Sequence, residues 1–203
     1  MPDPHLYFGF VATVTVLMLL PGPNVGLIVA NSIRYGIGYG LLTVAGTTAA
    51  MAVQLALTGL GLSTLLAGLG AWFAWVRWIG AAYLIYLGIR AWFAPPLAPG
   101  APAATRSTPR AILGRAVLVS LTNPKTLMFY GALLPQFITG SGVAHQMLVL
   151  ALTALAIALV IDSLWCLAAH RLRLRLSGRW ANRLSGGVLA GAGLGLALAR
   201  VRR

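Results

Sequence analysis

Long apolar segments separated by short connections make up almost the whole chain. The segments cover residues 6–33, 40–66, 72–93, 111–137, 143–170 and 184–199, of which the last is short and glycine-rich. An α-helix needs roughly 20 apolar residues to cross ~30 Å of hydrocarbon. The pattern therefore predicts an all-α polytopic membrane protein, with six transmembrane helices in a single membrane domain covering residues 1–203.

Prolines interrupt two of these segments. The interruptions are formed by Pro21, Gly22, Pro23 and Asn24 in the first segment and by Asn123, Pro124 and Lys125 in the fourth. A proline inside a helix removes a backbone donor and clashes with the preceding turn, at a cost of ~3 kcal/mol. In lipid the freed carbonyls must be satisfied by protein or by a water-filled cavity. We expect helices 1 and 4 to be broken, and a binding site at the breaks; kinks that only shape helix packing are the alternative.

A connector rich in proline, residues 94–110, divides the chain into two halves of three segments each, 1–93 and 111–203. Three crossings are an odd number, so the second half enters the membrane from the side opposite to the first. Both breaks lie ~18–22 Å along their helices, near the middle of the membrane from opposite sides. This arrangement predicts two inverted three-helix repeats whose breaks meet at the centre.

Charge sets the orientation. The chain is 59% hydrophobic and 8% charged, with a net charge of +13. Its internal arginines lie almost wholly in the first, third and fifth connections, as in loops that face anionic lipid in the cytoplasm, which argues against nucleic acid as the partner. We therefore expect both termini outside, N-out and C-out, although three arginines in the tail, residues 200–203, point the other way.

Asp162 and Lys125 are the ionisable residues well inside apolar segments, where a charge is a functional candidate. Asp162 can carry a proton or hold a substrate ammonium, and Lys125 can hold a carboxylate; a structural ion pair between them, or a snorkelling lysine, is the alternative. Gln54 is a weaker candidate, because one amide can simply hydrogen-bond a neighbouring helix.

The remaining features indicate structure more than chemistry. Gly187, Gly191 and Gly195 form a small-residue face for close packing inside the monomer or, as the alternative, in a homodimer. The single cysteine, Cys166, has no partner thiol. The chain lacks the common enzyme motifs and a cluster of metal ligands. We expect no enzyme activity, no metal and no cofactor.

Two motifs together resemble a known family. PGPN at residues 21–24 and NPK with PQF at residues 123–125 and 135–137 are similar, in order, to the LysE/RhtB family of bacterial amino-acid exporters, and the likeness extends over nearly the whole chain. Its motif positions fall on Pro21, Gly22, Pro23, Asn24, Asn123, Pro124, Lys125, Pro135, Gln136 and Asp162. Two features depart from it: Leu167, where members often have tyrosine, and the proline-rich connector.

The resemblance implies a six-helix protein of the bacterial cytoplasmic (inner) membrane that exports amino acids or small derivatives, of the homoserine, threonine, lysine or lactone type, in exchange for protons. The proton gradient then supplies the energy by antiport and alternating access, with the amino acid and membrane lipid as partners. A cation or heavy-metal exporter of the same broad superfamily is the alternative. A membrane redox conduit or enzyme is more remote, since Cys166 lacks a second thiol.

Overall fold

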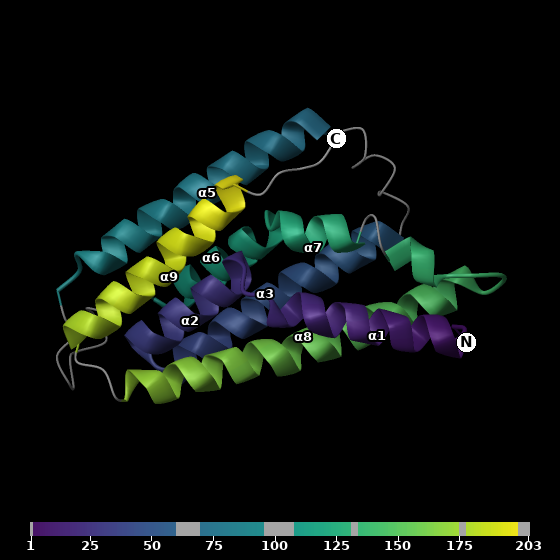
Figure 1. Ribbon diagram of the computed structural model, residues 1–203, viewed down its shortest axis with the longest axis horizontal. Helices are drawn as coiled ribbons and strands as arrows, with labels where there is room; N and C mark the ends of the chain where they lie inside the picture. Colours follow the sequence, from purple (N-terminus) through teal and green to yellow (C-terminus); the bar gives the residue numbers. More distant parts are fainter. Residues whose placement is uncertain (1, 60–69, 96–107, 131–133, 175–177, 199–203) are drawn as a thin grey trace.

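The structure, a computed structural model, describes residues 2–59, 70–95, 108–130, 134–174 and 178–198. The regular elements in these ranges are helical, which confirms the all-α class (Figure 1). In chain order they are α1 (Pro4–Leu19), α2 (Pro23–Tyr35), α3 (Ile37–Gly59), α5 (Gly70–Trp92), α6 (Pro109–Leu121), α7 (Pro124–Met128), the 3-10 helix η3 (Leu134–Phe137), α8 (Val143–Arg173) and α9 (Gly178–Leu198).

The predicted break in the first segment is present. α1 ends at Leu19 and α2 begins at Pro23, and the two helices are bent by 50° relative to each other. Between them Leu20 and Gly22 have extended backbone. Pro23 stands at the first position of α2, where its missing N–H is not needed and its fixed φ favours the helix. The prolines thus end one helix and start the next.

The break in the fourth segment has the same form. α6 ends at Leu121 and α7 begins at Pro124. Asn123 is the N-cap of α7, and its side-chain oxygen accepts a hydrogen bond from the backbone N–H of Lys125 at 3.1 Å. Both predicted breaks are therefore confirmed as helix ends, and each begins a new helix with proline.

Two described helices, α3 and α8, are each long and apolar enough to cross a membrane, and α1 with α2 qualifies as a third, bent span. The count of six spans stays a prediction. The sixth helix extends further than its apolar segment predicted, since α9 begins at Gly178 rather than Leu184. Helical hydrogen bonding continues through Arg179 and Arg183 because it does not depend on hydrophobicity. Most of the connector 94–110 and the arginines of the tail lie outside the described residues.

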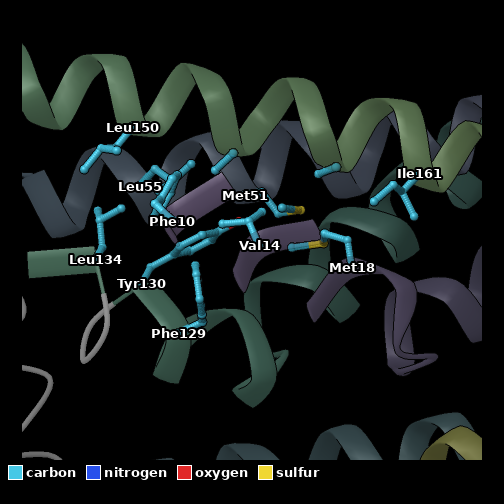
Figure 2. Packing of buried hydrophobic residues seen from close by; sticks show 12 residues of the cluster. Phe10, Val14, Met18, Met51, Leu55, Phe129, Tyr130, Leu134, Leu150 and Ile161 are labelled. Atoms are coloured by element: carbon cyan, nitrogen blue, oxygen red, sulfur yellow. The ribbon is translucent and has the colours of Figure 1, made fainter. Parts of the chain in front are cut away.

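The helices pack in pairs that are distant in sequence. α5 lies along α9 on one flank, α8 runs along the opposite flank, and α2, α3 and α6 lie between them (Figure 1). An apolar cluster fills the space between α1, α3, α8 and the segment around Tyr130, with Met18 and Ile161 at one end and Leu134 and Leu150 at the other (Figure 2).

The small-residue face of α9 differs from the predicted one. A Cβ at Gly186 would lie 2.6 Å from the carbonyl oxygen of Gly88, so Gly186 lets α9 approach α5. Gly187, Gly191 and Gly195 are exposed, and a Cβ at either of the last two would meet nothing within 4 Å. Packing inside the monomer uses Gly186 and Gly193 instead, because residues seven apart stay on one face of a 3.6-residue helix better than residues eight apart. A homodimer contact through Gly187, Gly191 and Gly195 stays a prediction.

Candidate functional site

The two helix breaks meet through a pair of asparagines. Asn123 Nδ2 donates a hydrogen bond of 3.0 Å to Asn24 Oδ1. Both side chains are buried, with 2% of Asn123 and 7% of Asn24 exposed. Asn24 occupies the first turn of α2, and Asn123 caps α7. The structure therefore brings the beginnings of two helices that are about half the chain apart into direct contact.

A hydrogen-bonded network extends from this pair to α3. Asn24 Nδ2 donates to Ser120 Oγ at 3.1 Å, and Ser120 Oγ donates to the backbone carbonyl of Thr47 at 3.1 Å. Ser120 and Thr47 are fully buried. The amides of both asparagines are thus held in place by neighbours from other helices, which orients the start of α2.

Gln54 donates hydrogen bonds to carbonyls at the end of α6, beside the second break. Its Nε2 donates to the carbonyl oxygens of Ser120 at 2.8 Å and Leu121 at 3.2 Å, in the last turn of α6. These carbonyls lose helical partners because the chain breaks and Pro124 has no N–H. Gln54 is 3% exposed, and its Oε1 has no hydrogen-bond partner. Gln54 therefore makes the helix contact that was the alternative to a role in the site, while its Oε1 remains as an acceptor without a partner.

Asp162 and Lys125 line one small pocket together with the asparagine pair. Asp162, on α8, is 2% exposed, and its Oδ2 has no hydrogen-bond partner. Lys125 Nζ donates to the backbone carbonyl of Leu20 at 2.6 Å, in the first break. No ion pair joins Asp162 to Lys125, so the structural ion pair offered as the alternative is not formed between these two described side chains.

The pocket is very small. Its volume is about 10 Å³, which is room for at most one water molecule. Met18 and Val25 add apolar walls, and Met18 continues into the cluster of Figure 2, so that cluster separates the pocket from the η3 end of the molecule. A carboxylate, an ammonium and two amides therefore meet in a space that must widen to admit a larger ligand.

The other predicted positions are divided between the pocket, the exposed surface and the part of the chain that is not described. Pro21 is exposed and Gly22 lines the pocket, whereas the side chain of Pro124 lies outside the described part of the chain. Pro135 and Gln136 are exposed in η3. Sequence reasoning missed Ser120 and Thr47, which extend the network to α3, and Thr126, which lines the pocket. Their only signal is a hydroxyl inside an apolar segment, which is common in membrane helices because such a hydroxyl can bond its own helix.

Comparisons with known proteins agree with the resemblance. A family described as LysE type translocator matches residues 15–200. An uncharacterized membrane protein of Vibrio cholerae is 34% identical and covers 98% of this chain and 99% of its own length. A homoserine/homoserine lactone efflux protein of Salmonella typhimurium is 32% identical over 85% of this chain and 84% of its own, and a leucine efflux protein of Salmonella choleraesuis is 35% identical over 65% and 63%. No solved structure matches.

Proposed function

Because this chain belongs to the LysE type translocator family, a family of multi-pass membrane proteins, we propose that it exports amino acids or small amino-acid derivatives across the bacterial cytoplasmic membrane. The observation that carries the proposal is the pocket where the two helix breaks meet, with Asp162 and Lys125 in its wall. An amino acid carries an ammonium and a carboxylate close together, and the pocket offers the complementary charge to each.

Asp162 and Lys125 bind opposite charges of the amino acid. Asp162 Oδ2 is a buried acceptor without a partner and receives the substrate ammonium. Lys125 exchanges its bond to the Leu20 carbonyl for the substrate carboxylate. The start of α2 assists, because no side chain caps Gly22 and the positive end of a helix dipole favours an anion. A bound amino acid then replaces the hydrogen bond from Lys125 to Leu20, which joins the two breaks.

Export is coupled to protons through Asp162. A protonated Asp162 no longer attracts the ammonium, so proton entry from outside releases the substrate there and the proton leaves toward the cytoplasm. The helix pairing supports alternating access by two inverted repeats, residues 1–93 and 111–203. α3 packs on α8 and α5 on α9, which are equivalent helices of the two repeats, and the contact of α1 with α8 corresponds to that of α6 with α3.

Efflux from vesicles with an imposed pH gradient tests this function. We expect Asp162→Asn to lower gradient-driven export of the substrate roughly tenfold or more, since it removes a charge-assisted hydrogen bond of about 1.5–3 kcal/mol. Asp3→Asn is the matched control, because Asp3 is the other acidic residue of the chain and caps α1, where asparagine caps equally well. Wild-type export by Asp162→Asn would refute the proton role.

A further inference from the structure

A second, apolar pocket lies beside the breaks. It has a volume of about 160 Å³ and lies between the start of α2, the middle of α5 and the last turn of α6. Tyr83 and Thr122 are the lining residues with polar side chains, and both are already hydrogen-bonded. Tyr83 accepts from Arg115 Nε at 3.2 Å, and the Thr122 hydroxyl donates to the Leu118 carbonyl at 2.9 Å. The chemistry of this pocket therefore suits a hydrocarbon group.

The apolar pocket and the polar pocket share the two breaks as their common wall. Pro23 lines the apolar pocket, and its neighbours Gly22 and Asn24 line the polar one. Thr122 lines the apolar pocket, and the next residue, Asn123, lines the polar one. The hydrogen bond between the two asparagines lies in this wall. Only the residues of the breaks therefore separate the two pockets here.

We propose that the apolar pocket receives the aliphatic side chain of the exported amino acid. This inference rests on the proposed function and names its substrate class. The polar pocket, at about 10 Å³, cannot also hold a side chain, whereas 160 Å³ is close to the ~150 Å³ of an apolar cavity that accepts benzene. Side chains of about four to six carbons fit such a space. Ile79 and Leu118 are 66% and 54% exposed at its rim, so a lipid chain is the competing occupant.

Two changes of pocket size test the inference in vesicles loaded with leucine, alanine or phenylalanine. Leu118→Phe partly fills the pocket, and we expect the ratio of leucine to alanine export to fall roughly tenfold, as for a steric mismatch in a hydrophobic pocket. Val119→Ala enlarges it, and we expect phenylalanine export to rise relative to leucine. Leu113→Phe is the matched control, because Leu113 is an exposed residue of the same helix that does not line the pocket.

The outcomes separate the two proposals. A selective change in these ratios, at equal protein amount in the membrane, supports the side-chain pocket. If the wild type exports amino acids but both variants keep its ratios, the pocket holds lipid and this inference is wrong. Equal loss of leucine and alanine export in Leu118→Phe would also overturn it. A wild-type protein that exports none of these amino acids, nor homoserine, its lactone, threonine or lysine, overturns the proposed function together with the inference.

Discussion

Asn123 combines two tasks in one side chain. Its oxygen caps α7 by accepting from Lys125 N, and its Nδ2 donates to Asn24 across the site. An amide is suited to this because it has both donors and an acceptor, so it satisfies a helix end and still reaches a neighbour. The residue therefore links the stability of one break to its contact with the other.

Substitutions at Asn123 separate these tasks. Asn123→Ser keeps a good capping group but is too short to reach Asn24, whereas Asn123→Ala loses both interactions. We expect both variants to export less, and Asn123→Ala to be less stable than Asn123→Ser by about 1 kcal/mol, the usual value of an N-cap. Thermal unfolding of the purified protein in detergent, beside the efflux assay, measures the two effects. Equal melting temperatures would show that the cap does not contribute.

Among the helices, α5 and α9 approach closely because glycines face each other. A Cβ at Gly186 would meet the Gly88 carbonyl oxygen at 2.6 Å and the Trp92 nitrogen at 2.8 Å, and these are backbone atoms that cannot turn aside. The next residue, Gly187, is exposed, and a Cβ there would meet only an edge atom of the Trp92 ring, at 3.6 Å. Neighbouring glycines of one helix therefore have different roles.

This difference predicts opposite effects of the same substitution. Gly186→Ala forces α9 away from α5, and we expect it to destabilise the protein by about 1–3 kcal/mol, as overpacking does. Gly187→Ala is its matched control and should be neutral or stabilising by up to about 1 kcal/mol, because alanine favours the helix. The amount of folded protein in the membrane and its melting temperature distinguish them. Loss of stability in both variants would mean that a second copy packs on the exposed face.

At the scale of the whole molecule, the length of α8 and the charges at its ends indicate how the protein is oriented in the membrane. Its 31 residues extend ~46 Å, more than enough to cross the hydrocarbon. Ser141 lies two residues before its first residue, and Leu174 directly follows its last. Basic residues gather at the second of these ends, where His170, Arg171 and Arg173 occupy the last turn. The positive-inside rule therefore predicts that this end faces the cytoplasm.

Cysteine labelling in intact cells checks the orientation. In a Cys166→Ser background, we expect Ser141→Cys to react with a membrane-impermeant maleimide and Leu174→Cys to react only after the membrane is opened. Both positions are exposed in the fold, so access to the reagent depends on the side of the membrane alone. Cys166 is buried and belongs to no metal or disulfide site among the described residues, so its replacement by serine should leave export intact. The reverse labelling pattern would place the N-terminus inside.

Local chemistry explains why the breaks could be predicted from the sequence. Pro23 and Pro124 lack the N–H that a continuous helix needs, wherever the helix lies, and hydrophobic length alone identifies α3 and α8 as spans. The pairing of the two breaks also predicted that Asn24, Asn123 and Lys125 lie close together in one site. The boundaries of α9 were less predictable, because a helix can continue past its apolar residues.

The sequence by itself determined the class of the protein, its apolar segments and its two broken helices, because each follows from residues adjacent in the chain. Only the tertiary structure decided that Asp162 reaches the breaks, that Ser120 and Thr47 connect them to α3, and that Gly186 rather than Gly187 faces α5. Such contacts join residues far apart in the chain. They depend on the rotation and register of each helix against its neighbours, which the packing of all the helices sets together.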